Sequence, residues 1–448
     1  MAAEIAHWFL NLPDVVQALI RAIIWVLFIF APVPLFIWWE RKLLSWMQDR
    51  IGPNRVGSVT FSKRGKAPAF LKGKSFTVFY GILQPLADGI KSFSKEDLAP
   101  NASDKFVYFL APAVALFPAF AIGAIVPWAS WRSLTPVGDV DIGVLYMLAI
   151  SSLGVYGVVL AGYSSNNKYS LLGGLRSSAQ LISYELSMGM SLAAIALATG
   201  SLRLTDMVQA QEGPFYGAVK FIQNWNVFTP FGFIAWVIFL ICMVAETNRA
   251  PFDLPEAESE LVAGYNTEYS TKKWVLFMMA EYVNMFIFGT VSVTVFWGGY
   301  NALPVNWEYL ANNAPGGAVW AFLGQIQYWL AFLVFFAKGF AMISFYIWLR
   351  ATMPRLRYDQ LMSLGWKTLL PLATVNFMVV ALWLVVTALM KVSSGDLIGI
   401  LVGWVVVLVA GAVIYVLYRI RKAISPGESG RLEPRTITLV DPNKEATA

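Results

Sequence analysis

Hydrophobic residues fall into nine long windows along this 448-residue chain. Each window is close to the roughly 20 apolar residues that a helix needs to cross the hydrocarbon core of a bilayer. Polar segments with proline and glycine separate them, whereas a membrane barrel would show short segments of alternating hydrophobicity. The pattern predicts an all-α polytopic membrane protein of about nine transmembrane helices. The windows lie near residues 17–39, 106–128, 143–163, 178–200, 228–247, 273–297, 320–349, 367–390 and 396–419.

A further amphipathic segment follows the first window. From Phe76 to Phe93, apolar side chains recur at helical spacing opposite Gln84, Asp88 and Lys91. This pattern favours a helix that lies in the membrane interface. A plain surface anchor is one interpretation of it.

Lysine and arginine are concentrated in alternate segments between the windows. The segments 40–105, 162–177, 248–273, 350–367 and 419–448 hold 27 of the 33. The positive-inside rule then predicts an N-terminus outside and a basic tail in the cytoplasm. The net charge of +6 therefore reflects topology and attraction to anionic lipids, with no nucleic acid as partner. Arg21 and the absence of a small-residue cleavage site favour a retained first span over a signal peptide.

Composition limits the chemistry that the chain can perform. Charged residues are 13% of the total, about half the share in soluble domains. Cys242 and His7 are the only residues of their types. An internal disulfide is therefore impossible, and we expect no metal, haem or iron–sulfur site and no catalytic group in this chain alone. If redox chemistry is involved, the electron carriers belong to other subunits.

Four ionisable residues lie well inside the windows, where charges are costly and usually functional. At 1.5 Å per residue from the cytoplasmic side, Glu185 lies about 11 Å and Glu281 about 12 Å deep, and Glu246 lies at the inner mouth. The same count places Lys338 about 16 Å deep. We expect a single polar cluster in the cytoplasmic half that exchanges protons. Static ion pairs are the alternative, although one lysine cannot neutralise three carboxylates. A secondary transporter fits these features equally well.

The segment from 246 to 270 is acidic where basic loops are expected. It carries six acidic residues around the single Arg249. A solvated surface that faces a partner has the same composition, so the residues alone leave its role open.

Three stretches of this chain carry longer motifs. The first comprises Glu40–Lys42, Gln48–Gly57 and Gln84–Lys91. The second is the acidic run Ala245–Leu261 with Glu268–Tyr269, and the third is Trp348–Met362. In this order they resemble the H subunit of bacterial respiratory complex I, which is one of its membrane subunits. The similarity extends from about residue 17 to 390.

The resemblance implies a membrane subunit of proton-pumping NADH:quinone oxidoreductase in the bacterial cytoplasmic membrane. Such a subunit forms a tunnel for ubiquinone or menaquinone and begins the proton path. FMN and iron–sulfur clusters would lie in partner subunits of the membrane and peripheral arms. The tunnel role carries over to Arg41, Asp88, Arg249, Arg350 and Arg355. The proton-path role carries over to Tyr184, Glu185, Glu246, Glu256, Glu258 and Glu281, and we place Lys338 with them from its predicted depth.

The chain departs from the family pattern in two places. A basic insert at about 58–79 separates two motifs. The ninth window and a tail follow the family core of eight helices, so we expect one domain at 1–395 and an added helix with tail at 396–448. The nearest rival function is the anchor subunit of a related membrane-bound hydrogenase or formate-hydrogen lyase. An autonomous ion transporter would show repeats around a midplane site, and the sequence has neither.

Overall fold

The computed structural model of the chain describes most of the helical part of the molecule. The described residues are 13–54, 56, 58–60, 75–77, 81–129, 138–215, 219–253, 263–313, 317–390, 402–408 and 411.

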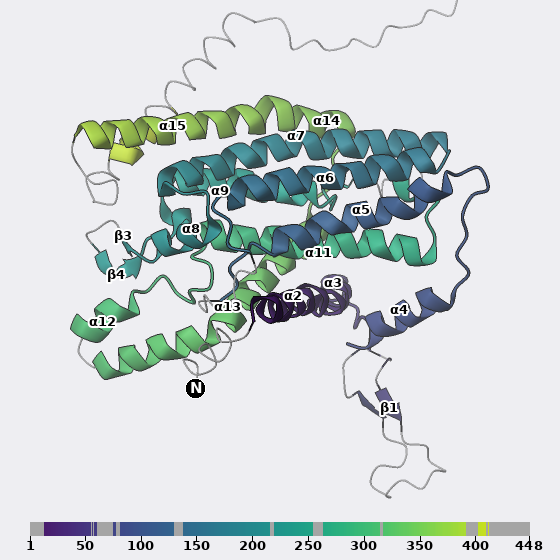
Figure 1. Cartoon of the computed structure of the whole chain (residues 1–448), viewed down its shortest axis with the longest axis horizontal. Coiled ribbons are helices and arrows are strands. Elements are labelled where there is room, and N and C mark those ends of the chain that lie inside the picture. The colour runs from purple at the N-terminus through teal and green to yellow at the C-terminus, as the bar shows by residue number, and fades with distance from the viewer. Residues whose placement is uncertain are drawn as a thin grey trace, which may run out of the picture.

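Long helices lying side by side make up the body of the molecule (Figure 1). In this bundle, α5 packs on α6 and α11, α6 on α7, and α7 on α9 and α15. The helix α13 packs on α11 and α3 and crosses the others obliquely (Figure 1). The helices of the bundle are α2 (Asp14–Phe30), α3 (Pro32–Met47), α5 (Lys105–Gly123), α6 (Gly143–Ser164), α7 (Lys168–Thr199), α9 (Pro230–Glu246), α11 (Thr271–Phe296), α13 (Gly317–Thr352) and α15 (Leu370–Leu389).

Seven helices of the described residues are long and apolar enough to cross a membrane, and α9 is a shorter apolar helix of 17 residues. Each of the first eight hydrophobic windows corresponds to one of these eight helices, with α2 and α3 joined into one span over Val15–Met47. The prediction of an all-α polytopic membrane protein is therefore confirmed. The described parts of the ninth window, 402–408 and 411, are helical.

Local sequence signals explain where several helices begin and end. The Asp104 side chain accepts from the Val107 N–H at the start of α5, and Asn167 accepts from the Tyr169 N–H at the start of α7. These side chains satisfy backbone donors that have no partner within the helix. The helix α7 ends at Gly200, whose φ of 74° is a left-handed conformation that glycine adopts without steric cost.

The remaining elements are short. Two antiparallel strands, β1 (Ser58–Thr60) and β2 (Ser75–Thr77), lie within the basic insert. A second pair is formed by β3 (Pro214–Phe215) and β4 (Val219–Gln223). The described residues also form three single-turn helices: η1 (Asn226–Phe228), η2 (Gly264–Asn266) and the π-helical turn η3 (Gly365–Leu369). The short α-helices are α4 (Gln84–Ser94), α8 (Leu204–Gln211), α12 (Trp307–Asn313) and α14 (Tyr358–Leu364).

The amphipathic helix α4 is shorter than predicted. It begins at Gln84 rather than at Phe76, because Phe76 belongs to β2 and proline at position 85 suits a first helical turn. Its apolar residues Leu86, Ile90 and Phe93 are exposed on the surface of the chain. A row of exposed apolar side chains on a short helix fits contact with lipid.

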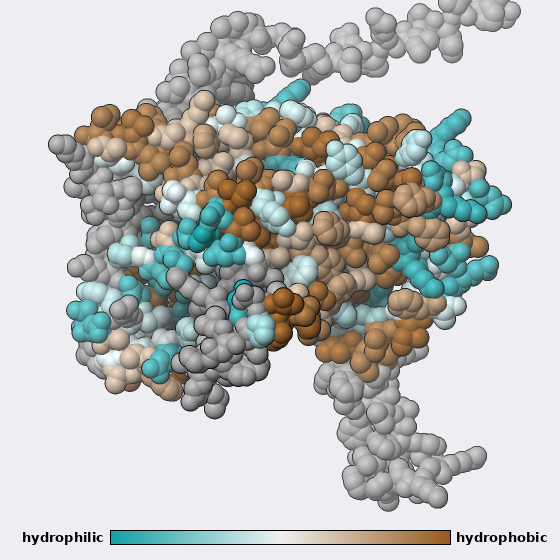
Figure 2. Space-filling view, in the orientation of Figure 1, coloured by the Kyte–Doolittle hydropathy of each residue, from teal (hydrophilic) through white to brown (hydrophobic). Residues whose placement is uncertain are grey.

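The bundle has two ends, which are formed by different elements. At one, here called the α4 end, lie the end of α3, α4, η2 and the start of α11 (Figure 1). At the other, the β3–β4 end, lie β3, β4, α12 and the end of α11 (Figure 1). Figure 2 shows apolar side chains along the flanks and hydrophilic ones at both ends of the bundle.

Close backbone contacts fix η2 on the bundle at the α4 end. A Cβ atom on Gly173 of α7 would lie 2.5 Å from the Cα of Gly264 in η2, and one on Gly162 of α6 would lie 2.8 Å from the Ser170 carbonyl oxygen. Small residues allow helices in membranes to approach in this way. The stacked rings of Tyr108 and Tyr269 add a second contact here. Burial raises the pKa of Tyr269 to about 12, so its neutral phenol donates to the Tyr108 carbonyl.

Candidate functional site

A cluster of buried charges lies where α3, α11, α13 and the turn after α9 meet. The Glu40 carboxylate is its centre and is only 4% exposed. It pairs with Arg249 at 3.5 Å and with Arg350, and it accepts a 2.5 Å hydrogen bond from the Tyr282 hydroxyl. Arg249 also pairs with Glu281 at 3.4 Å. We call these five residues the Glu40 cluster: Glu40, Arg249, Glu281, Tyr282 and Arg350.

Charge within the Glu40 cluster is balanced. Its two guanidinium groups face two carboxylates, and the Arg249 guanidinium lies 4.6 Å from the centre of the Tyr282 ring. Removing one member of a buried ion pair typically costs about 3–5 kcal/mol, because the remaining charge is left without a partner. The cluster therefore couples four separate chain segments electrostatically.

The turn after α9 holds Arg249 in place through backbone hydrogen bonds. Gln180 of α7 donates 2.8 Å bonds to the carbonyl oxygens of Ala245 and Phe252, on either side of this turn. Ser177, one helical turn earlier, donates to the Asn248 side chain at 3.3 Å. A buried glutamine with backbone partners on both sides fixes the loop on α7.

Two further glutamates lie deeper in the bundle beside a small cavity. Glu246 is 8% exposed, and its Oε2 is buried with no hydrogen-bond partner among the described residues. Glu185 accepts a 2.6 Å hydrogen bond from Ser151. The cavity has a volume of about 50 Å³ and is lined by Ser151, Glu246 and Glu281 among others, so it has room for roughly three water molecules.

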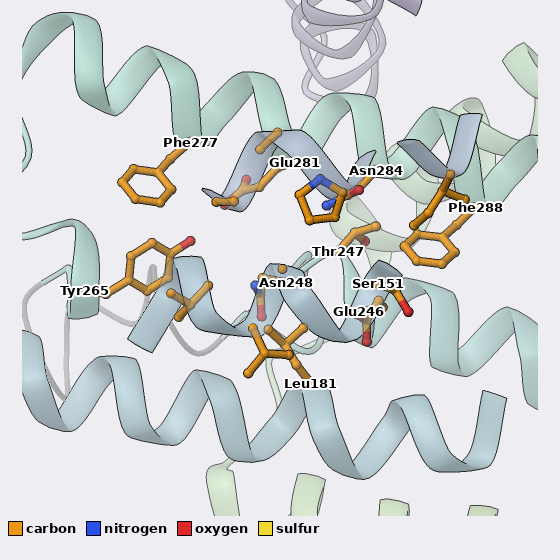
Figure 3. Close-up of a pocket in the computed structure, with 17 residues that line it drawn as sticks. Ser151, Leu181, Glu246, Thr247, Asn248, Tyr265, Phe277, Glu281, Asn284 and Phe288 are labelled. Atoms are coloured by element: carbon orange, nitrogen blue, oxygen red, sulfur yellow. The ribbon is translucent and has the colours of Figure 1, made fainter. Parts of the chain in front are cut away.

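Figure 3 shows how this carboxylate cavity is arranged. Glu281 and Asn284 of α11 lie on one side, and Glu246, Thr247 and Asn248 lie on the other. Glu281 thus belongs both to the Glu40 cluster and to the carboxylate cavity. Glu185 connects to the cavity through Ser151. The structure therefore brings together three of the four predicted intramembrane charges.

Lys338 lies elsewhere, and the prediction of one cluster that includes it is wrong. Its ammonium group donates to carbonyl oxygens just beyond the end of α11, those of Trp297 at 2.6 Å and Asn301 at 2.5 Å. Glu281 precedes Trp297 by sixteen residues, about 24 Å along a helix. The depth estimate failed because it took residue 349 as the membrane surface, whereas the adjacent Arg350 already pairs with Glu40 of the Glu40 cluster. Lys338 lies twelve residues, about 18 Å of helix, before Arg350 on α13 and therefore well beyond the level of the cluster.

Tyr184 is fully buried but points away from the carboxylates. Its hydroxyl donates to the Leu361 carbonyl of α14 at 2.9 Å, and its ring packs against Phe252. Glu256 and Glu258 lie outside the described residues.

The remaining predicted arginines form ion pairs that join loops at the α4 end. Arg41 of α3 pairs with Asp88 of α4 at 2.6 Å, and both side chains are partly exposed. Arg355 pairs with the buried Asp253 at 3.3 Å. The Leu356 N–H also donates to the Pro251 carbonyl, so the loop before α14 is joined to the start of the acidic segment.

An apolar cavity of about 330 Å³ lies between α3, α4 and α11. Its walls include Val33 and Ile37 of α3, Phe93 of α4, and Leu276 and Met279 of α11. Ile37 is one helical turn before Glu40 and Arg41, and Met279 is one turn before Tyr282. The apolar cavity therefore adjoins the helical turns that carry the Glu40 cluster and the Arg41–Asp88 pair.

Sequence reasoning missed three residues of this site. In the sequence, Glu40 stands out only as part of a motif at the end of the first window, although it is the centre of the cluster. Tyr282 and Gln180 give weak signals, because a tyrosine next to a glutamate and a glutamine within an apolar helix are not unusual. Burying a glutamine side chain without hydrogen-bond partners costs free energy, so a glutamine within an apolar helix indicates that such partners exist. Among the described residues, no group of three or more His, Cys, Asp or Glu residues is placed to hold a metal ion.

Fold and site together define an integral membrane protein in which buried, paired charges adjoin an apolar cavity. A family model described as NADH dehydrogenase matches residues 20–381. The chain is 45% identical to the first NADH-quinone oxidoreductase H subunit of Geobacter metallireducens over 76% of this chain and 88% of the relative. It is 41% identical to the corresponding H subunit of Ralstonia nicotianae over 86% of this chain and 96% of the relative.

This chain belongs to the family of NADH-quinone oxidoreductase H subunits. It is thus a membrane subunit of an enzyme complex, and the predicted family is confirmed. These matches favour the quinone enzyme over the hydrogenase anchor and over the autonomous transporter.

Proposed function

We propose that this chain provides the passage by which quinone reaches the reducing centre of the complex and the first section of the proton path. The observation that carries this proposal is the apolar cavity beside the Glu40 cluster. A neutral quinone with an isoprenoid tail needs an apolar passage, and α4 offers exposed apolar side chains at one wall of this cavity. Polar groups for the quinone head would come from the tunnel residues Arg41, Asp88, Arg249, Arg350 and Arg355.

Charge changes on the quinone are the proposed link to proton movement. Reduction of a quinone to a quinol takes up two electrons and two protons, so negative charge appears transiently near the headgroup. In surroundings of low dielectric constant, such a charge strongly alters the proton affinity of nearby carboxylates. The Glu40 cluster responds first, because two arginines in it can redistribute between Glu40, Glu281 and the quinone.

Glu281 connects this response to the interior in our proposal. It faces the carboxylate cavity, where water molecules would join it to Glu246 and, through Ser151, to Glu185. Water in such a cavity carries protons between carboxylates that are too far apart to touch. Glu256 and Glu258, in the acidic segment, and Tyr184 complete the proposed path.

The proposed orientation follows from the basic segments. Those between the helices lie at the α4 end, so this end faces the cytoplasm of a bacterial inner membrane and the N-terminus lies outside. Peripheral-arm subunits, with FMN and iron–sulfur clusters, would dock at the α4 end. Other membrane-arm subunits and anionic lipids would contact the flanks.

Filling the apolar cavity tests the quinone passage. Met279→Trp places a large ring in the cavity, and we expect slower NADH:quinone reduction with long-tailed quinones and a raised KM. Reduction of a water-soluble acceptor by the flavin-containing arm should be unchanged in the same membranes. Leu382→Trp, at an exposed position on α15, is the matched control.

Two results would contradict the passage. One is wild-type quinone kinetics in an assembled Met279→Trp complex. The other is an equal loss in Met279→Trp and Leu382→Trp, which would point to impaired folding instead.

A further inference from the structure

The partners of Lys338 differ from those of the charged residues in the Glu40 cluster. Its ammonium group donates to three carbonyl oxygens, those of Trp297, Gly299 and Asn301, at 2.6, 3.1 and 2.5 Å. It also lies 4.3 Å from the centre of the Trp225 ring. The end of a helix carries partial negative charge on its free carbonyls, so the lysine caps α11. No carboxylate among the described residues pairs with it.

A polar cavity of about 460 Å³ lies next to this lysine at the β3–β4 end. Its wall includes Glu212, Asn301, Trp307, Gln327 and Tyr328. The Glu212 carboxylate accepts from the Asn301 amide at 3.4 Å, and Gln327 donates to the same amide at 3.1 Å. The volume holds more than ten water molecules, and the polar wall supplies partners for them.

Asn301 connects the cavity to the lysine. Its side chain lines the cavity, while its main-chain carbonyl accepts from the Lys338 ammonium group. On α13, the wall residues Gly324, Gln327 and Ala331 recur at helical spacing, and Lys338 is two turns beyond Ala331. Helical side chains lean toward the N-terminus, so the long lysine side chain extends toward the cavity.

A lysine that only capped the helix would not need a polar cavity beside it. Intramembrane lysines are costly and typically line pathways for ions, and a buried lysine loses its proton more readily than an arginine does. If the ammonium group gives one proton to water, it becomes a neutral amine and the water becomes hydronium. The amine keeps two N–H donors for three carbonyls, and water from the cavity can then donate to the Asn301 carbonyl.

We propose that this polar cavity is an aqueous vestibule through which Lys338 exchanges its proton with the compartment at the β3–β4 end. The titratable groups that face this route are Glu212, Tyr300 and Tyr328, all in the cavity wall. The ligand of the site is water and the proton that it carries. This goes beyond the proposed function, which concerns quinone and carboxylates near the α4 end, and it stands independently of quinone access.

Thiol labelling from each side of sealed membranes tests the vestibule. The single natural cysteine, Cys242, is buried, so it adds little background from this chain. In the assembled complex, Gln327→Cys should react with a membrane-impermeant charged maleimide added at the β3–β4 side. Leu333→Cys is the control: it lies on the same helix, but it is exposed outside the cavity wall, where we expect it to face lipid. We expect it to react at least about tenfold more slowly, because thiols in apolar surroundings do not ionise.

A small cationic methanethiosulfonate extends the test to the lysine. Lys338→Cys should react from the β3–β4 side and not from the α4 side. Labelling of Gln327→Cys only from the α4 side, or at the rate of Leu333→Cys, overturns the vestibule. Gln327→Cys decides this point even when Lys338→Cys fails to assemble.

Proton exchange itself is tested with Lys338→Met, which has similar length and no charge. The readout is protons translocated per NADH oxidised in reconstituted vesicles, a ratio that does not depend on how much complex assembles. We expect this ratio to fall in Lys338→Met and to stay below wild type in Lys338→Arg, since arginine does not release its proton. An unchanged ratio in an assembled Lys338→Met complex overturns the exchange role, whereas the Met279→Trp experiment above bears only on quinone access.

Discussion

Charged side chains within this bundle are stabilised in two different ways at its opposite ends. In the Glu40 cluster, two arginines and two buried carboxylates neutralise each other, and Arg249 lies between both carboxylates. At the β3–β4 end, Lys338 has only carbonyl dipoles and an aromatic ring around it among the described residues. The first arrangement links chain segments through charge, whereas the second holds a single charge beside a cavity that has room for water.

This difference determines how strongly the Glu40 cluster and Lys338 respond to a new charge nearby. A balanced set of full charges is sensitive to any new charge nearby, because its ion pairs can rearrange. A cation held by carbonyls responds less to a new charge, because the carbonyls belong to the backbone and cannot rearrange as ion pairs do. We therefore expect the Glu40 cluster to sense the quinone and Lys338 to exchange protons with water.

The largest effect should come from removing the centre of the Glu40 cluster. Glu40→Ala leaves Arg249 and Arg350 without their shared carboxylate, and we expect a loss of about 3–5 kcal/mol of stability. Native gels should show little assembled complex. Glu40→Gln keeps the shape and a partner for Tyr282, so it should assemble better. Glu96→Gln, on an exposed residue, is the control, and normal amounts of complex in Glu40→Ala would contradict the electrostatic role.

The next effect should appear in turnover rather than in assembly. Glu246→Gln removes a titratable group whose Oε2 has no described partner, so we expect normal assembly. Quinone reduction and pumping should fall at least about tenfold, as is typical when a positioned proton carrier is lost. The measurements are the NADH:quinone rate and the proton yield of the purified complex. Wild-type turnover in an assembled variant would remove Glu246 from the proton path.

A smaller change in stability should follow from Lys338→Met. The carbonyls of Trp297, Gly299 and Asn301 lose their donor, which typically costs about 1–3 kcal/mol. The loss should be below that of Glu40→Ala, because no full charge is left without a partner. Thermal inactivation of both purified variants, side by side, measures the difference. A larger loss in Lys338→Met would show that the two sites do not differ in this way.

The smallest effect should be at the half-exposed Arg41–Asp88 pair. Partly exposed pairs contribute about 0–1 kcal/mol and weaken in salt. Arg41→Gln should therefore leave thermal stability nearly unchanged while raising the KM for quinone, since α4 is one wall of the apolar cavity. Kinetics at low and high ionic strength measure this effect. A marked loss of stability with normal KM would make the pair a structural anchor only.

Periodicity and charge predicted much of this fold but only part of the site. The hydrophobic windows located eight spans because burial in lipid demands long apolar stretches. They failed on α4, where the apolar spacing continues before Gln84 although Phe76 lies in a strand. Such a boundary depends on the pairing of β1 with β2, which spacing alone does not reveal.

Site residues were predictable when their type was unusual in its surroundings. Glu185, Glu246 and Glu281 stand out inside apolar windows, and the structure brings them close together. Depth counted along one helix could not locate Lys338, because the count took the end of the apolar window as the membrane surface, whereas Arg350 at that end pairs with the buried Glu40. Glu40 was overlooked because a charge at the end of a span is ordinary, and only its partners on α11 and α13 show that it is buried.

The missing side chain of Gly173 has a consequence for the surface at the α4 end. It lets the segment around Gly264 rest directly on the backbone of α7, with no side chain between them. A methyl group at position 173 would lift that segment by a fraction of the width of one atom layer. For a partner subunit that docks at the α4 end as proposed, the absence of a side chain at this one glycine sets the height of the surface that the partner meets.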